Sequence, residues 1–102
     1  MNINYTGKFY KGLTREMKSP NHKVKLTYEV GQTYSVEDFD TSGEQCSTGI
    51  HVVTSLAAAL KWGPVVVEMS VPDTAQVVWG PDKVRVSEAT VVWVINLSRA
   101  NL

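Results

Sequence analysis

The stretch CSTGIHVVTSLAAALKW, residues 46–62, decides the fold because it holds the one strong helical pattern of the chain. Thr54 or Ser55 can accept hydrogen bonds from the free N–H groups of a first helical turn, and residues 56–62 are good helix formers. Gly63-Pro64 ends the pattern, because glycine tolerates a left-handed cap and proline cannot continue a helix. The sequence therefore predicts one clear helix over residues 54–62.

Residues 47–53, directly before this helix, have the alternation of a half-buried strand. One face of that strand carries Thr48, Ile50 and Val52, of which we expect Ile50 and Val52 to be buried. The opposite face carries Ser47, Gly49, His51 and Val53. This interpretation lets the His51 side chain face a cleft.

Other strand-like stretches occur before and after this segment, at residues 9–13, 24–30, 65–71, 75–79, 83–86 and 89–97. In the second of them alternation places Val24, Leu26, Tyr28 and Val30 on one face, and in the third it places Val65, Val67, Met69 and Val71 on one face. A turn at Gly31-Gln32 leads into residues 33–36, and the acidic residues 37–45 have the composition of a solvated loop held by Phe39.

The apolar stretch 89–97, ATVVWVINL, is expected in the middle of a sheet. Together these patterns predict a single small α+β domain, residues 1–102, with a mostly antiparallel sheet of about six or seven strands and one helix.

The composition of the chain narrows the classes of function that it can have. Ten acidic and ten basic residues balance, which argues against nucleic acid or a membrane surface as the partner. Cys46 is the single cysteine and cannot form an internal disulfide, and the first residues lack the apolar core of a signal peptide. The apolar runs are far shorter than the roughly 20 residues that cross a bilayer. We therefore expect a cytosolic protein.

Polar groups gather just before the helix, where Ser47, Thr48, Gly49 and His51 supply hydroxyls, a free backbone and one titratable ring. They suit a ligand-binding edge. The alternative is a plain strand whose hydroxyls satisfy neighbouring backbone and whose histidine is half exposed. The helix N-terminus at residues 54–56 offers N–H groups to an anion.

The segments FYKGL, YEVGQTY, CSTGIHVVTSLAAALKW, VVVEMSV and KVRVSEATVV occur in an order that resembles an uncharacterised family of small domains in bacteriophage genomes and beside pentapeptide repeats. That resemblance implies a phage association and no defined activity.

In outline the chain is also similar to the ADP-ribosyltransferase fold. Tyr10, Lys11 and Gly12 stand where that fold has an aromatic-Arg-Gly or His-Gly element, and CSTGIHV stands where it has a Ser-Thr-Ser element. Lys11 replaces the usual arginine or histidine, and only Glu68 and Glu88 are available for the late catalytic glutamate. The likeness implies a cleft for a nucleotide-like ligand.

Aromatic and basic residues near the C-terminus have two interpretations each. The three tryptophans Trp62, Trp79 and Trp93 are expected in the core, although Trp79 beside the Gly80-Pro81 turn could instead reach the rim of a cleft. Lys83 and Arg85 would share one face and could neutralise phosphate. Their alternative role is a solvated basic edge that discourages aggregation.

Several kinds of site do not fit the sequence. His22, His51 and Cys46 have no metal-ligand spacing. A Cys46–His51 nucleophile pair would lie on opposite faces of a strand, and no glycine-rich phosphate loop is present.

We predict a phage-associated binding protein of the host cytosol, without catalytic residue, metal or cofactor, which captures a small anionic or nucleotide-like ligand or a host protein without turnover. The candidate ligand-binding residues are Tyr10, Lys11, Gly12, Ser47, Thr48, Gly49, His51, Trp79, Lys83 and Arg85. Two alternatives are an ADP-ribosyltransferase-like enzyme that uses His51 with Glu68 or Glu88, and a structural interaction module that works through an exposed sheet edge.

Overall fold

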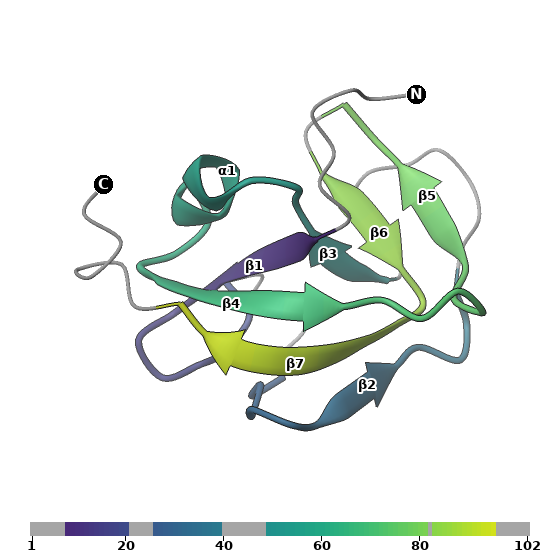
Figure 1. Cartoon of the computed structure of the whole chain (residues 1–102), viewed down its shortest axis with the longest axis horizontal. Coiled ribbons are helices and arrows are strands. Elements are labelled where there is room, and N and C mark those ends of the chain that lie inside the picture. Colours follow the sequence, from purple (N-terminus) through teal and green to yellow (C-terminus); the bar gives the residue numbers. More distant parts are fainter. Residues whose placement is uncertain (1–7, 21–25, 40–48, 82, 96–102) are drawn as a thin grey trace.

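The computed structural model describes residues 8–20, 26–39, 49–81 and 83–95. In this part of the chain seven strands form two antiparallel sheets with one short helix, α1 (Leu56–Leu60), so the predicted α+β class is confirmed (Figure 1). The four-stranded sheet has the order β1 (Phe9–Leu13), β4 (Val65–Ser70), β7 (Glu88–Val94), β2 (Thr33–Ser35). The three-stranded sheet has the order β3 (Ile50–Val52), β6 (Val84–Val86), β5 (Val77–Trp79).

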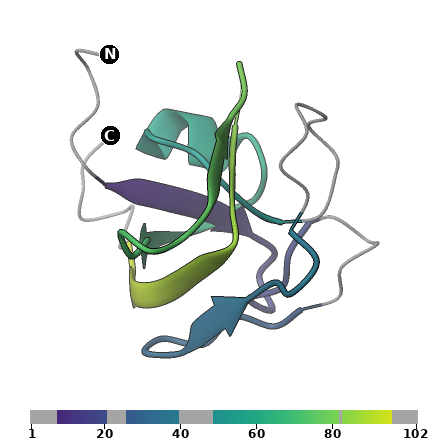
Figure 2. The same cartoon turned by 90° about the vertical axis from the view of Figure 1, so that its right-hand side faces the viewer.

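The two sheets meet at an isolated bridge, where Tyr10 of β1 pairs with Val53 just after β3. The backbone N–H of each residue donates to the carbonyl of the other at 2.8 Å. Figure 2 shows that β5 and β6 run steeply across the four-stranded sheet. Beyond this bridge the described residues of β1 and β3 form no ladder.

The main core lies between the sheets and is built from alternate residues of the strands. Ile50 and Val52 are buried, and Val67 and Met69 on β4 face them, as alternation predicted. β7 pairs with both β4 and β2, which confirms that the apolar stretch near the C-terminus runs through the middle of a sheet. The buried members of this core are Phe9, Leu13, Tyr28, Ile50, Val52, Val67, Met69, Val84, Val86, Ala89 and Val91.

Helix α1 covers the outer face of β1 and β4, where Val53, Ala59 and Val66 form a second buried cluster. Val53 is therefore buried, although alternation placed it on the open face with His51. The helix approaches β1 so closely that a Cβ on Gly12 would overlap the carbonyl oxygen of Ala59. This contact makes glycine the residue that fits at position 12.

The helix is shorter than predicted and ends differently. Ser55 is its N-cap, and the Ser55 hydroxyl accepts from the N–H of Ala58 at 3.1 Å. The helix ends at Leu60, and its C-cap Lys61 is right-handed, with φ −67°. Gly63 is not among the described glycines with positive φ, so the expected left-handed cap is wrong. Glycine is needed there because a Cβ would overlap the carbonyl of Leu13.

The predicted strand at residues 24–30 is also wrong over its described part. Residues 26–30 contribute only an isolated bridge between Thr27 and Lys18. The Tyr34 hydroxyl holds this segment in an irregular path, since it accepts from the N–H of Glu29 and donates to the carbonyl of Thr27. Tyr28 is buried, but Val30 is 53% exposed. Val24 lies outside the described residues.

All three tryptophans are exposed, by 43% at Trp62, 54% at Trp79 and 56% at Trp93, so their expected core positions are wrong. Trp93 follows a β-bulge between β4 and β7, on the outer face. The five-residue helix packs against β1 and β4 and makes too few contacts with β7 to cover it. Among the described residues, large apolar side chains therefore remain on the surface beyond the reach of the helix.

Candidate functional site

A cavity of about 270 Å³ lies between β1 and β3, next to the bridge that joins the two sheets. Five residues that the sequence singled out line it: Tyr10, Lys11, Gly12, His51 and Lys83. The prediction that the YKG and STGIH strands face one cleft is thus consistent with the cavity for these residues.

The sequence missed the other half of the lining, which consists of Ser19, Pro20, Val52, Val53 and Trp62. Ser19 and Pro20 belong to the loop after β1, and Trp62 follows the helix. The exposed position of Trp62 could have been predicted from its place directly before Gly63-Pro64, because a residue at the end of a short helix is less covered than one in its middle. No pattern in the sequence marked the loop.

Lys11 is the unusual group of the cavity, because only 5% of this basic residue is exposed. Alternation places it on the inner face of β1 between Phe9 and Leu13. Lys11 Nζ donates to the backbone carbonyl of His51 at 2.7 Å and lies 5.5 Å from the centroid of the Tyr28 ring. Lys11 makes no ion pair with any described carboxylate. A carbonyl dipole and an aromatic face therefore hold its charge.

Burial and a neighbouring cation both disfavour the charged form of Lys11. Burial lowers the pKa of the Lys11 ammonium from 10.5 to about 8, and Lys83 adds to this effect. The Tyr28 ring lies against the Lys11 amine. Burial and Tyr34 raise the pKa of the Tyr28 phenol from 10.0 to about 12, so the phenol stays neutral. The cavity therefore presents two basic groups without a described negative partner for Lys11.

The rim of the cavity combines a cation with an aromatic ring. Lys83 Nζ lies 4.9 Å from the centroid of the Trp62 ring, and Trp62 is 43% exposed. A cation above an exposed indole is held by the ring quadrupole, which contributes about 0.5–1 kcal/mol at such a site. A ligand anion can contact Lys83 while its planar part packs on the adjoining apolar surface.

Other predicted site residues lie elsewhere. Ser47 and Thr48 are outside the described residues. Gly49, with φ +150°, lies against Phe39, and a Cβ there would come within 2.9 Å of that ring. Arg85 is 2% exposed, and its guanidinium lies 5.4 Å from the centroid of the same ring. Neither Gly49 nor Arg85 lines the cavity.

Lys83 and Arg85 therefore do not act as a joint phosphate site, and the alternative of a solvated basic edge is also wrong for Arg85. β6 is the central strand of its sheet, and Arg85 is buried. Trp79 is at the surface, but it does not line the cavity. Its ring packs on Phe9, with the centroids 5.9 Å apart.

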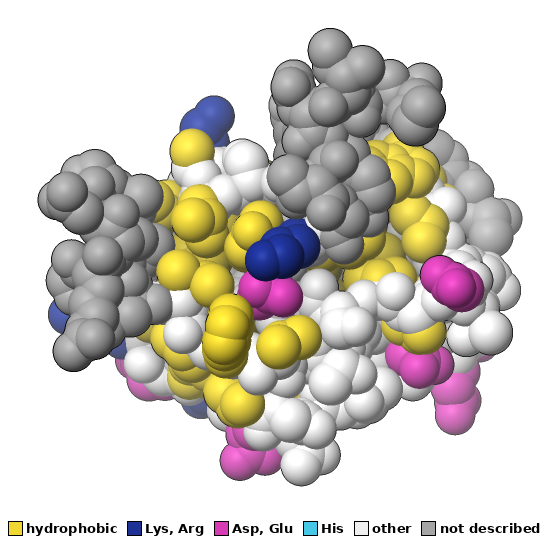
Figure 3. Space-filling model, viewed as in Figure 1, with side chains coloured by type: hydrophobic (Ala, Val, Ile, Leu, Met, Phe, Trp, Pro, Cys, Tyr) yellow, Lys and Arg dark blue, Asp and Glu magenta, His cyan; other side chains and the backbone are white. Residues whose placement is uncertain are grey.

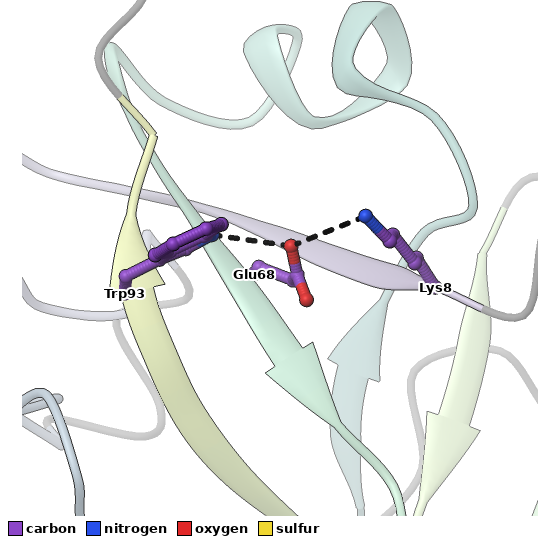
Figure 4. Close-up of polar contacts among 3 residues, drawn as sticks. All are labelled: Lys8, Glu68 and Trp93. Atoms are coloured by element: carbon purple, nitrogen blue, oxygen red, sulfur yellow. Dashed lines mark hydrogen bonds and ion pairs between the residues drawn. The ribbon is translucent and has the colours of Figure 1, made fainter.

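The two glutamates considered for catalysis are also away from the cavity. Glu68 is on the outer face, where its Oε1 accepts from Trp93 Nε1 at 3.1 Å and lies 4.0 Å from Lys8 Nζ (Figure 4). Figure 3 shows hydrophobic side chains gathered on this face, around α1 and across the ends of β4 and β7. Glu88 begins β7, opposite Ser35. Neither Glu68 nor Glu88 lines the cavity.

Within the described ranges, no three His, Cys, Asp or Glu side chains come together to hold a metal ion. His22 and Cys46 lie outside those ranges. The described helix is too short to cross a bilayer.

No match to this chain is found among protein-family models, curated proteins or solved structures. The resemblance to phage-borne domains therefore remains a prediction, as does the likeness to ADP-ribosyltransferases.

Proposed function

We propose that this domain reversibly binds a small anionic ligand in the cavity between β1 and β3 and releases it unchanged. The observation that carries the proposal is the pair Lys11 and Lys83, which line one cavity that has no carboxylate among its described lining residues. A buried cation is stabilised when an anion enters beside it, because low dielectric strengthens the attraction. The ligand thus supplies the negative partner that Lys11 lacks among the described residues.

The size of the cavity restricts the ligand. A volume of about 270 Å³ is just below the range of about 300–1,000 Å³ that is typical of ligand pockets. It suits one ring with one phosphate or carboxylate group, as in a mononucleotide or an aromatic acid. A dinucleotide such as NAD is too large to be enclosed.

The composition of the lining favours the same kind of ligand. Val52, Val53 and Trp62 provide apolar surface, and Lys11 and Lys83 provide positive charge. Pockets that combine apolar walls with a few polar groups hold the ring by burial and orient it by charge. These features support a mononucleotide-like or aromatic acid ligand over a host protein.

The transferase alternative has less support. Stabilising an oxocarbenium-like transition state needs a carboxylate near the reacting carbon. Glu68 is bound to Trp93 and Lys8 on the outer face, and Glu88 also lies away from the cavity. Binding without turnover therefore accounts for the lining better than transfer chemistry.

Thermal shift and calorimetry with adenosine monophosphate, nicotinate and 4-(hydroxymethyl)benzoate test the proposal, with uncharged adenosine as the control ligand. A ligand at 100 times its dissociation constant should stabilise the fold by about 2.7 kcal/mol. We expect at least one of the three anions to bind and to be recovered unchanged after denaturation, while adenosine binds more weakly.

A matched pair of variants locates the site. Lys83→Gln removes a cavity cation, whereas Lys61→Gln removes an exposed lysine that does not line the cavity. Lys83→Gln should weaken binding of the anion about tenfold, which corresponds to about 1.4 kcal/mol, and Lys61→Gln should leave it unchanged. The proposal is wrong if none of the anions binds, or if both variants weaken binding equally.

A further inference from the structure

The chemistry of Lys11 goes beyond charge attraction. Lys11 is one of the residues that line the cavity, it lies on the inner face of β1, and it makes no ion pair with a described carboxylate. Most lysines are kept inert by full protonation in water. Lys11 is instead almost fully buried, and its ammonium is held by one carbonyl oxygen and one aromatic face.

A second lysine lies in the same cavity. Desolvation together with a neighbouring cation is the arrangement that turns a lysine amine into a nucleophile. At pH 7.5 a pKa of about 8 leaves roughly a quarter of the amine neutral, against about one part in a thousand for an ordinary lysine. Among the described residues, the titratable groups that line the cavity with Lys11 are Lys83, Tyr10 and His51, and the neutral phenol ring of Tyr28 lies against its ammonium.

We propose that Lys11 captures carbonyl-bearing anions, aldehydes or keto acids with one carboxylate or phosphate, as a reversible imine inside the cavity between β1 and β3. The inference rests on the proposed function, because it names the class of anion that the same cavity prefers. It extends that function from attraction of charge to covalent recognition of a carbonyl carbon.

The step balances without any further reactant. The lone pair of neutral Lys11 Nζ attacks the carbonyl carbon, the C–N bond forms as the carbon–oxygen π bond breaks, and one proton of the amine moves to the oxygen to give a neutral carbinolamine. The remaining carbon–oxygen bond then breaks, and the hydroxyl leaves as one water with the second proton of the nitrogen, which gives the neutral imine. Protonation of this imine by solvent water gives the iminium. Addition of water reverses both events and returns the carbonyl compound unchanged.

The surrounding groups favour each stage. The positive charge of Lys83 stabilises the oxyanion that develops as the carbonyl is attacked, and it also holds the anionic group of the ligand. The apolar walls of Val52 and Val53 keep bulk water away from the imine. The His51 carbonyl, which accepts from Lys11 Nζ, fixes the direction of the amine.

The experiment treats the whole protein with 4-carboxybenzaldehyde and sodium cyanoborohydride, which reduces an imine to a stable secondary amine. Intact mass and peptide mapping then identify the labelled lysine among the seven in the chain. We expect labelling at Lys11 at pH 7.5 to be at least tenfold faster than at any other lysine. The Lys11 rate should reach half its maximum near pH 8.

Variants separate nucleophile from neighbour. Lys11→Met should abolish the fast label, and Lys83→Gln should slow it at pH 7.5 and move the rate profile to higher pH. Lys61→Gln is the control and should change neither. Peptide mapping of the wild-type protein keeps the test valid if a variant does not fold.

The outcomes distinguish this inference from the proposed function. Labelling spread evenly over the lysines overturns the inference. If 4-(hydroxymethyl)benzoate, which has no carbonyl to attack, binds in the cavity while the aldehyde does not label Lys11, anion binding stands and imine formation is wrong. If neither compound binds and no fast label forms, both proposals fall for aromatic acids of this size.

Discussion

The buried amine of Lys11 should make the stability of the domain rise with pH in a range where most proteins gain little. The pKa is about 8 in the fold and 10.5 in the unfolded chain, so between these values the unfolded chain binds more protons. The Lys11 contribution to stability therefore increases as pH rises from about 8 to 10.5, and its cost is greatest below pH 8. The difference in pKa corresponds to about 3 kcal/mol in total, of which about 2 kcal/mol is recovered between pH 7 and 9.5.

Urea unfolding followed by tryptophan fluorescence at pH 7, 8, 9 and 9.5 measures this rise. Lys11→Met should remove the rise, because the variant has no amine to neutralise. Its stability at one pH is a poorer guide, since the His51 carbonyl loses a donor, which costs about 1–3 kcal/mol at every pH. Lys61→Met, at an exposed site, is the control and should keep the wild-type slope.

The pH range of the assay stops below the titration of Tyr28. The pKa of that phenol is about 12 in the fold and 10.0 in the unfolded chain, so stability falls again as pH rises above 10. Parallel curves for the wild-type protein and Lys11→Met between pH 7 and 9.5 would refute the reasoning. They would mean that the amine is already solvated in the fold.

Three further substitutions test contacts that hold the fold together. Gly12→Ala should destabilise the domain by about 2 kcal/mol or more, because its Cβ meets the Ala59 carbonyl; chemical denaturation measures this, and an unchanged midpoint would show that the helix can move away. Ser55→Ala should cost about 1 kcal/mol through loss of the N-cap, measured by the same assay. Phe39→Leu should lower stability by about 1–2 kcal/mol, because the ring covers the Arg85 guanidinium, and an exposed position such as Ser35→Ala supplies the baseline.

Alternation was sufficient to predict much of the core, and the reason is geometric. A strand has only two faces, so a pattern with period two assigns Val67 and Met69 to one face once either is buried. The same rule could have found the burial of Lys11, which shares a face with Phe9 and Leu13 on β1. Its charge hid this, because lysine is seldom fully buried.

Position relative to other layers could not be predicted in the same way. The hydrophobic side chain of Trp93 predicts burial, but whether another layer covers that side chain depends on the length and placement of α1. That helix has five residues and lies on β1 and β4. Arg85 shows the converse, since a loop ring at Phe39, distant in sequence, covers a charged side chain. Both outcomes depend on contacts between segments far apart in the chain.

A buried ammonium without an anion lowers the stability of the empty domain, and this cost bears on what the cavity does. A methionine at position 11 would fill similar space between Phe9 and Leu13 without a desolvation penalty. The lysine is destabilising by about 3 kcal/mol at neutral pH, and an anion beside it can return part of that energy as binding. The affinity for an anion should therefore be higher when Lys11 is charged, whereas imine formation should be faster when Lys11 is neutral. Both quantities are measured across pH 7 to 9 on one preparation. The affinity for 4-(hydroxymethyl)benzoate should fall as the rate of labelling by 4-carboxybenzaldehyde rises. Two profiles that rise or fall together would show that different groups control binding and labelling.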